Sequence, residues 1–491
     1  MWRYDGHNRR PFSALTDNHY GRRVIYTNQN NIDGTNILEE LGKAIGIHNQ
    51  NAMEIEYLDR YYRGDCPILY RKKDVRPEVN NKIVENIAQF IVETKTSAMV
   101  GEPVQYVLRG TDKAKSEQIA NLNTIMESED KAYYDVSLCR WRSICGTAYR
   151  FVGNDDNRGS LLDESVFYFE SCDPMKTFVV YYNNDKPAFS VQIYKNESDK
   201  YEYFIYTNTE YFVTDGKEIL DSGRNGNGAI PVVEYPNNER RISDIELTIS
   251  MTDEINRMAS DRANGIEQFV SSWIKFINCD IDAETFKKMR MEGALVVKSN
   301  NGAENKADVD VMTSELNQTE SQVAVEDTYE KLLVIQGIAN RQTSSSGDTG
   351  SAVRYRDGWI DSDARAKVNE PIFKRSERMA LRLILNRLRI TDGFTLVPSD
   401  VEIHIARSMN DNLLTKSEAL QMLLASGIKP ERAIKTIGLF SDPEQVAVES
   451  RKRMEVLYPE KVEKPVINVV QDDTQVNNNQ NEEVNANGQP S

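Results

Sequence analysis

The sequence has few of the residues from which catalytic and metal sites are built. Its 491 residues include four histidines and five cysteines, and no two cysteines form a CxxC pair. An odd number of scattered cysteines argues against a disulfide framework and a zinc site, and is typical of a reducing compartment. We expect buried, unreactive thiols, no metal and no cofactor. The cysteines are Cys66, Cys139, Cys145, Cys172 and Cys279.

Long apolar runs are also missing. No stretch of about 18 or more apolar residues occurs, so no transmembrane helix and no membrane partner are expected. The first residues, MWRYDGHNRRPFSALTDN, lack the apolar core of a secretory signal.

Basic residues are outnumbered. There are 60 Lys and Arg against 76 Asp and Glu, which gives a formal net charge of −16. Proteins that hold duplex DNA by its phosphates are normally basic. Taken alone, the charge therefore argues against tight DNA binding.

The N-terminal part is predicted to be a polar arm followed by helices. Residues 1–38 are rich in Asn and Gly, and we expect little fixed structure there. Helical spacing follows at 37–64, and again where Ile83, Ile87, Ile91 and Val92 would share one face. Two further helices are expected at about 112–127 and 131–144.

From about residue 148 to 235 the apolar pattern alternates with period two, in runs such as AFSVQIYK and KYEYFIYT separated by NNDKP, NESD and DG. This predicts an antiparallel β meander. We therefore expect an α+β fold that is mainly helical, with the meander as its main sheet.

Long helices are expected after the meander. Ser243 and Glu246 form a capping-box pattern at the start of a helix predicted to run to residue 277. A small module follows at 278–313, then a helix at about 316–338 and one from 351 to about 390. Pro371 lies inside the last helix and should kink it. The basic run of this helix could pair with acidic neighbours across subunits or bind DNA; we favour the pairing across subunits. The run is Lys374, Arg375, Arg378, Arg382, Arg387 and Arg389.

The stretch QTSSSGDTGSAVRYR, residues 342–356, has the Ser, Gly and Thr of a phosphate-binding loop. A Walker A loop needs a Lys after its second glycine and a preceding strand. Here Gly347 and Gly350 are three residues apart, no Lys follows, and a helix precedes. The stretch is therefore interpreted as a loop without nucleotide, and no enzyme is expected.

Several stretches together resemble the portal proteins of tailed double-stranded-DNA bacteriophages, in the branch of long-tailed phages of Gram-positive hosts. They are YLDRYYRGDCPILYRKK, NNKIVENIAQFIVETKTSAMVGEPVQY, NNERRISDIE with SDRANGIEQF, and SSGDTGSAVRYRDGWID followed by FKRSERMALRLILNRL. They occur in the family's order over roughly residues 50–455.

The resemblance implies a portal-type fold whose parts can be placed on this chain. It implies a wing at 1–240, stem helices at 241–277 and 314–340, a clip at 278–313 and a tunnel loop at 341–351. A kinked wing helix and strand would follow at 352–400, with a crown at 401–460 and a disordered tail at 461–491.

The resemblance also implies a function. Portal proteins form a ring, twelve-fold in the virion, at one capsid vertex. The ring nucleates capsid assembly and lets double-stranded DNA pass in and out. Its partners would be terminase, the major capsid and scaffolding proteins, head-completion proteins and other copies of itself. An acidic channel would give the phosphates no site at which to be trapped, so the negative charge fits this role.

Candidate site residues follow from the same resemblance. The tunnel loop would comprise Gln342, Thr343, Ser344, Ser345, Ser346, Gly347, Asp348, Thr349 and Gly350. Candidates for the stem lining are Asp253, Glu254, Arg257, Asp261 and Glu267, although each could equally be solvated or paired between subunits. Candidates for partner contacts in the clip are Asp282, Glu284, Lys287, Lys288, Asn300 and Asn301.

Two other functional classes remain open. One is an ATP-dependent DNA translocase or nuclease, which DNA-stimulated ATP hydrolysis would reveal. The other is a binding module of one or two subunits, which its native mass would reveal. Neither has a motif in this sequence.

Overall fold

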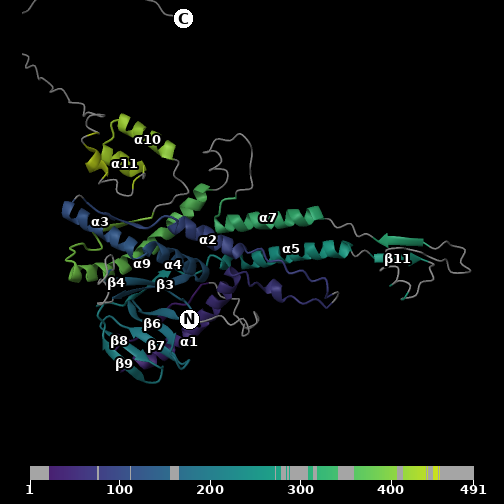
Figure 1. Cartoon of the computed structure of the whole chain (residues 1–491), viewed down its shortest axis with the longest axis horizontal. Coiled ribbons are helices and arrows are strands. Elements are labelled where there is room, and N and C mark those ends of the chain that lie inside the picture. Colours follow the sequence, from purple (N-terminus) through teal and green to yellow (C-terminus); the bar gives the residue numbers. More distant parts are fainter. Residues whose placement is uncertain are drawn as a thin grey trace, which may run out of the picture.

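The computed structural model describes residues 21–270 except 75–76, 111 and 155–164. Beyond these it describes 273–277, 284, 287, 308–312, 318–340, 359–405, 413–437, 440, 446–451 and 453. Figure 1 shows a body of helices and sheets from which one pair of helices projects.

The larger sheet of the body has six strands in the order β1-β5-β6-β7-β8-β9. Strands β5 to β9 form the predicted antiparallel meander. Asp185 (φ 60°) and Asp199 (φ 61°) lie in two of its turns, in a conformation that Asp tolerates better than most residues. The strands are β5 (Thr177–Tyr182), β6 (Pro187–Lys195), β7 (Tyr201–Tyr206), β8 (Glu210–Thr214) and β9 (Ile219–Arg224).

For residues 21–38, the part of the expected arm that the structure describes, the prediction of little fixed structure is wrong. Strand β1 (Ile25–Thr27) pairs in parallel with β5 at the sheet edge. Ile25 and Ile32 are buried in the core beneath this sheet. The polar composition concealed this strand because it is only three residues long and two of them, Ile25 and Thr27, are buried.

A second sheet holds β10 (Val232–Pro236), β3 (Thr147–Asn154) and β4 (Phe167–Cys172) in that order. The expected single meander is therefore split between two sheets. Gly146 (φ 81°) joins helix α4 (Lys131–Cys145) to β3, and a Cβ there would lie 2.0 Å from the Arg241 carbonyl oxygen. Only glycine fits this junction.

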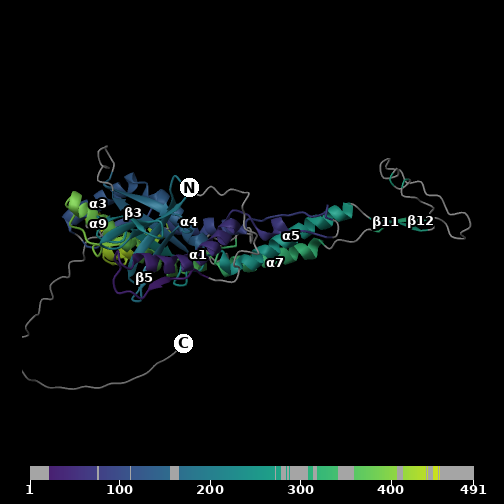
Figure 2. The same cartoon turned by 90° about the horizontal axis from the view of Figure 1, so that it is seen from below.

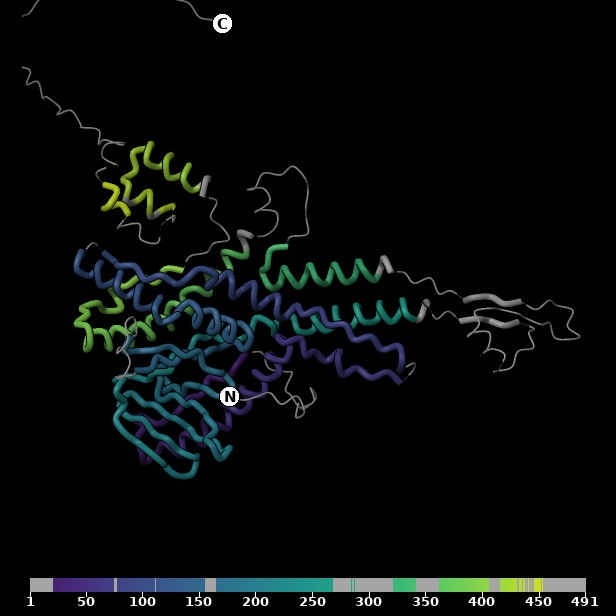
Figure 3. The backbone as a smooth tube through the Cα atoms, viewed as in Figure 1, coloured from purple at the N-terminus to yellow at the C-terminus, as the bar shows by residue number. Residues whose placement is uncertain are grey.

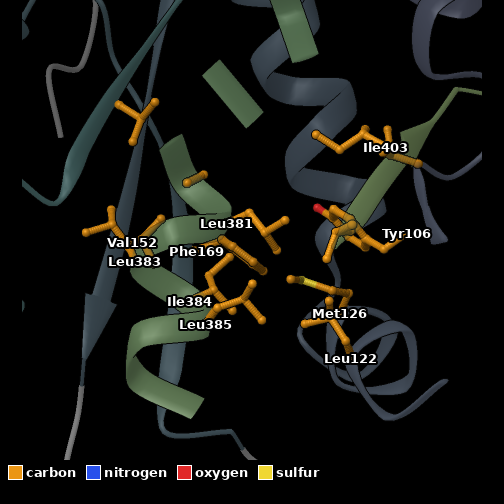
Figure 4. Packing of buried hydrophobic residues seen from close by; sticks show 14 of the residues in the cluster. Tyr106, Leu122, Met126, Val152, Phe169, Leu381, Leu383, Ile384, Leu385 and Ile403 are labelled. Carbon is orange, nitrogen blue, oxygen red and sulfur yellow. The ribbon is translucent and has the colours of Figure 1, made fainter. Parts of the chain in front are cut away.

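The largest apolar core joins distant parts of the chain. Helix α9 (Trp359–Thr391) packs its leucines against the second sheet and against α3 (Lys113–Ser128). Strand β13 (Val401–His404) pairs with β2 (Gln105–Leu108), and Ile403 and Tyr106 point into the same core (Figure 4). By its packing, β13 thus belongs to the body rather than to the C-terminal helices, although the expected crown begins at residue 401.

The remaining helices of the body are close to their predicted positions. Helix α1 (Ile37–Tyr62) and the short η2 (Pro67–Tyr70) precede α2 (Ile87–Val100). Ile83 was expected on the buried face of the second helix, but it precedes α2 and is exposed. The C-terminal helices α10 (Leu413–Ala425) and α11 (Pro430–Ile437) pack on each other. The tube view in Figure 3 follows the chain from the body to this pair.

The projecting pair consists of α5 (Ile249–Val270) and α7 (Gln318–Gln336). The predicted helix to residue 277 is too long: α5 ends at Val270, and β11 (Trp273–Ile277) pairs with β12 (Asp308–Met312). Trp, Ile and Phe in WIKFI favour a strand over a helix, which accounts for the difference. Figures 1 and 2 show this ribbon at the far end of the pair.

Candidate functional site: the projecting helices and their root

The helix α5 starts from a capped turn. Glu246, in the short helix η3 (Glu246–Thr248), accepts a hydrogen bond from the Ser243 backbone N–H at 2.6 Å. The Ser243 hydroxyl accepts from the Ile245 N–H at 3.0 Å. This is the predicted capping box displaced by one position, because a 3₁₀ turn precedes α5. Arg22 pairs with Glu246 from the N-terminal segment.

One face of α5 holds an extended segment of the chain through a ladder of polar side chains. Asn256 Oδ1 accepts from the Glu85 N–H at 2.8 Å, and Ser260 Oγ from the Ile83 N–H at 2.9 Å. Asn264 Oδ1 accepts from the Asn81 N–H at 2.7 Å. The spacing of four residues puts all three on one helical face, where they replace the sheet partners that the extended backbone lacks.

Another face of α5 is apolar and packs against α7. Ile255 is fully buried with Leu332 and Leu333 of α7, and Ile87 and Ile91 of α2 complete the cluster. Met251, Met258 and Tyr329 pack around it. The helix pair is thus joined to the body through α2. Ile266, further along α5, is exposed.

Asp253, the first lining candidate, is turned toward the body. Its carboxylate accepts hydrogen bonds from the Tyr61 hydroxyl at 2.9 and 3.0 Å. Burial raises the pKa of the Asp253 carboxyl, and the Tyr61 hydrogen bond opposes this only in part. In the folded chain Asp253 therefore contacts α1 and is only partly exposed to solvent.

The other four lining candidates lie on or near the surface of α5. Asp261 is 2.8 Å from Arg71 and 3.7 Å from Arg257. Glu254 pairs with Arg257 at 2.5 Å, which holds the pKa of the Glu254 carboxyl below its usual range. Glu267 accepts from Asn81 Nδ2 at 2.7 Å. Each of these carboxylates has a partner within its own chain, so the outer charge of α5 is mixed rather than purely acidic.

At the root of the projecting pair, the end of α7 is tied to the start of α9. Arg365 Nη1 donates to the carbonyl oxygens of Val334 and Ile335, both at 3.1 Å. Gly337 follows with φ 66°, and a Cβ there would lie 2.6 Å from Arg365 Cδ. Gln336 Nε2 donates to the Asp244 carbonyl oxygen and the Thr248 hydroxyl at 2.7 Å each. These contacts hold the end of α7, which precedes the loop predicted to face DNA.

A cavity of about 790 Å³ lies at this root, between α2, α4, α7 and α9. Its charged groups are paired: Lys95 Nζ lies 2.9 Å from Asp244 Oδ1, and the Ser143 hydroxyl donates to Asp244 Oδ2 at 2.6 Å. Burial alone would raise the pKa of Asp244, but Lys95 and Ser143 hold it below its ordinary value. Arg142 donates to the carbonyls of Pro236 and Asn237. The charged groups of the cavity wall are thus held by internal contacts, whereas Thr96 Oγ1 and Gln336 Oε1, on two lining residues, are buried without a hydrogen-bond partner among the described residues.

The structure describes only some of the remaining predicted site residues. The tunnel-loop residues Gln342 to Gly350 lie outside the described residues, as do Asp282, Lys288, Asn300 and Asn301 of the clip. Glu284 and Lys287 are helical and exposed. Pro371 lies inside α9, and the kink there stays a prediction.

On α9 the basic side chains and the leucines between them differ in burial. Arg375, Arg378, Arg382 and Arg389 are exposed, whereas the interleaved leucines are buried. Lys374 pairs with Glu370 on the same helix at 2.5 Å. Pairing between subunits, which the sequence analysis favoured, stays a prediction.

The described residues contain no constellation for catalysis. They hold no group of three or more His, Cys, Asp or Glu placed to bind a metal ion. The thiols of Cys66, Cys139, Cys145 and Cys172 are buried, and burial raises their pKa values. No helix among the described residues is long and apolar enough to cross a membrane.

The sequence analysis missed the polar ladder and Arg365. The sequence does contain a signal for the ladder: polar residues recur every fourth position at Thr252, Asn256, Ser260 and Asn264. In the structure all four side chains are buried. Polar residues at helical spacing indicate a buried polar face when another backbone must be satisfied there. Arg365 had no such signal, since its partners are carbonyls some 30 residues away.

The described residues thus form a body of helices and sheets from which one pair of helices projects. The chain belongs to the family of phage portal proteins described as SPP1 Gp6-like, whose model matches residues 41–456.

Two solved structures match the chain at low sequence identity and low TM-score. One is described as the neck of an empty GTA particle computed with C6 symmetry. It is 11% identical in sequence, the match covers 72% of this chain and 90% of the other, and the TM-score is 0.43. The other is described as the virion of a native gene transfer agent particle. It is also 11% identical, the match covers 82% of this chain and 93% of the other, and the TM-score is 0.42. No curated protein matches the chain.

Proposed function

We infer that the chain is the subunit of a ring, twelve-fold in the virion, that forms the channel for double-stranded DNA at one capsid vertex. The observation that carries this is the family match, which extends over residues 41–456 and so includes the body, the helix pair and the C-terminal helices. In this account α5 and α7 are the stem, and the β11–β12 ribbon is part of the clip.

The surface charge suits a channel through which DNA slides. Each copy has a formal charge of −16. On the outside of α5, Glu254 and Asp261 are paired with arginines of the same chain, and Glu267 accepts a hydrogen bond from Asn81. Such a lining offers few unpaired cations to hold phosphates, so counterion release would contribute little binding. The candidates for the channel lining remain Glu254, Arg257, Asp261 and Glu267. The Asp253 carboxylate instead accepts hydrogen bonds from the Tyr61 hydroxyl.

The partners and the location follow from the same role. The clip would contact terminase and later the head-completion proteins, the wing would contact capsid and scaffolding proteins, and the ring would nucleate capsid assembly. ATP hydrolysis would belong to terminase. The protein would reside at the portal vertex of the virion, and in the host cytoplasm during assembly.

The native mass of the purified protein tests this function. The account predicts a closed assembly of about twelve subunits without ATPase activity. A mass of one or two subunits, or DNA-stimulated ATP hydrolysis, would reject it.

A further inference from the structure

The cavity at the root of the helix pair has walls from four helices that are far apart in the sequence. Helices α2, α4, α7 and α9 contribute to it, and Figure 1 shows them meeting where the pair leaves the body. Hydrogen bonds from Arg365 of α9 to the last turn of α7 hold two of these walls together. The volume of about 790 Å³ is within the usual range of ligand pockets.

The charged side chains of the cavity wall already have partners within the chain. Lys95 pairs with Asp244 at 2.9 Å, and Glu93 accepts from an arginine of α4 at 2.8 and 3.0 Å. The guanidinium groups of Arg142 and Arg365 donate to main-chain carbonyl oxygens. A charged ligand would compete with these contacts, whereas a neutral ligand would leave them intact. The wall therefore favours an uncharged ligand.

Two neutral polar atoms of the same wall have no hydrogen-bond partner among the described residues. They are the hydroxyl oxygen of Thr96 on α2 and Oε1 of Gln336 on α7, and both residues are only 4% exposed. The Gln336 amide is held by its Nε2, which donates to the Asp244 carbonyl oxygen and the Thr248 hydroxyl. Its Oε1 is an acceptor only, and the Thr96 hydroxyl can donate or accept. Buried groups of this kind indicate that a ligand or a water supplies the hydrogen bond.

The mouth of the cavity is apolar. Phe90, Leu247 and Ile335 line the cavity and are 44%, 54% and 47% exposed, so they lie where it opens to solvent. Exposed apolar side chains gathered beside a pocket are typical of a binding site. Neutral polar groups inside and apolar groups at the mouth suit a ligand that has both an amide and an apolar side chain.

We propose that this cavity binds a neutral amide that carries an apolar side chain, as a peptide does. An amide N–H would donate to Gln336 Oε1, and an amide oxygen would accept from the Thr96 hydroxyl. The apolar side chain would pack against Phe90, Leu247 and Ile335. Such an amide can belong to a neighbouring copy in an assembly or to a molecule in solution. The site lies within one subunit, so it does not depend on the ring proposed above.

Saturation-transfer NMR on the full-length protein tests the site with probes that differ in charge. The probes are acetyl-leucine amide, which is neutral, acetyl-leucine, which carries a carboxylate, and leucine amide, which carries an ammonium group. We expect only the neutral probe to bind, with a Kd on the order of 1 mM for so small a molecule. Stronger binding of acetyl-leucine would overturn the proposal, because Arg142 and Arg365 would then recognise the ligand.

Two variants locate the bound probe. Thr96→Val removes the unpartnered hydroxyl and should weaken binding about three- to tenfold, while the midpoint of thermal unfolding stays unchanged or rises. Ala366→Trp fills the cavity from α9 and should abolish binding. The matched controls, Thr124→Val and Ala120→Trp at exposed positions of α3, should bind like the wild type. A lower unfolding midpoint in Thr96→Val would mean that the hydroxyl is already satisfied. Unchanged binding in Ala366→Trp would place the probe elsewhere, and either result overturns the proposal.

Size-exclusion chromatography distinguishes the two sources of the amide. Binding of the neutral probe by single subunits but not by assemblies would identify a neighbouring copy as the natural occupant. Binding by assemblies would identify a molecule from solution. Absence of binding in every fraction would mean that the cavity holds only water, which would overturn the proposal. If the wild-type chain forms no assembly, the proposed function fails while the probe still decides the site.

Discussion

Arg150 Nη1 lies 3.1 Å from Glu377 Oε2, and neither side chain has any solvent exposure. Arg150 is on β3 and Glu377 on α9, so this ion pair joins the second sheet to the long helix. Asp135 and Lys131 extend the network from α4, and the hydroxyls of Tyr106 and Tyr235 donate to Glu377. A buried charge with several partners is costly to disturb one residue at a time.

Glu377→Gln should therefore destabilise the body strongly. It leaves Arg150 and Lys131 buried with one carboxylate fewer, and we expect a loss of about 3 to 5 kcal/mol in the free energy of unfolding, measured by chemical denaturation. The matched control is Asp327→Asn, which removes an exposed i,i+4 pair with Lys331 and should cost less than about 1 kcal/mol. Equal losses in the two variants would contradict the role of the network.

Because of this network, we expect the free energy of unfolding to depend on pH in the strongly acidic range. Burial opposes ionisation of Glu377, but Lys131 and Arg150 lower its pKa to about 2. Because the folded pKa is below the ordinary value, the stabilisation is present at neutral pH and is lost as the pH falls from about 4.5 towards 2. Glu377→Gln should lose this part of the pH dependence, as followed by denaturant midpoints between pH 5 and 2.

His48 provides a separate dependence at milder pH. Burial lowers its pKa to about 4, its ring stacks on Phe178 at 4.3 Å, and Nε2 donates to the Met175 carbonyl oxygen at 3.0 Å. The unfolded chain takes up this proton first, so stability should fall as the pH drops from about 6.5 to 4, by about 3 kcal/mol in total. His48→Gln keeps a donor and should flatten the slope between pH 7 and 5; an unchanged slope would contradict the assignment.

The polar ladder on α5 should be needed to hold the segment 79–86. Asn256→Ala and Ser260→Ala each leave a backbone N–H of this segment without its acceptor, at about 1 to 3 kcal/mol. We expect faster amide hydrogen exchange at Ile83 and Glu85 in both variants. Arg262→Ala, at an exposed position on the same helix, should leave the exchange rates unchanged.

Arg365 should control the end of α7. Arg365→Ala removes both hydrogen bonds to the last carbonyls of the helix, and hydrogen exchange over residues 333–340 should accelerate. Lys367→Ala, which loses only an exposed pair with Asp363, is the control. Gly337→Ala should destabilise the wild-type chain more than the Arg365→Ala chain, because part of its cost is the contact with the arginine.

Deletion of Ser344 to Gly350 tests the predicted tunnel loop. If these residues contact DNA in the channel, packaging in a reconstituted assay should fall sharply while ring formation persists. Packaging at the wild-type level would reject the tunnel-loop assignment.

The sequence predicted the local elements better than their partners. Periodicity placed the helices at 37–64, 112–127 and 131–144, because their apolar faces pack on adjacent parts of the body. The parallel pairing of β1 with β5 and the pairing of β13 with β2 join residues about 150 and 300 positions apart, and no local pattern specifies such partners. The cap at Ser243 was predictable because its hydrogen bonds are local: Glu246 accepts from the Ser243 N–H, and the Ser243 hydroxyl accepts from the Ile245 N–H.

In the candidate site, too, local features were predictable from the sequence and long-range contacts were not. Charge and spacing indicated Glu254, Arg257 and Asp261 as surface residues of α5, which they are. The turn of Asp253 toward Tyr61 depends on how α1 packs against α5, 192 residues away in sequence, and so could not be predicted.

Electron microscopy of the purified full-length protein, viewed end-on, tests the central claim most directly. The account predicts particles with twelve-fold rotational symmetry and a central opening wide enough for a DNA double helix. Particles with neither symmetry nor an opening would contradict it.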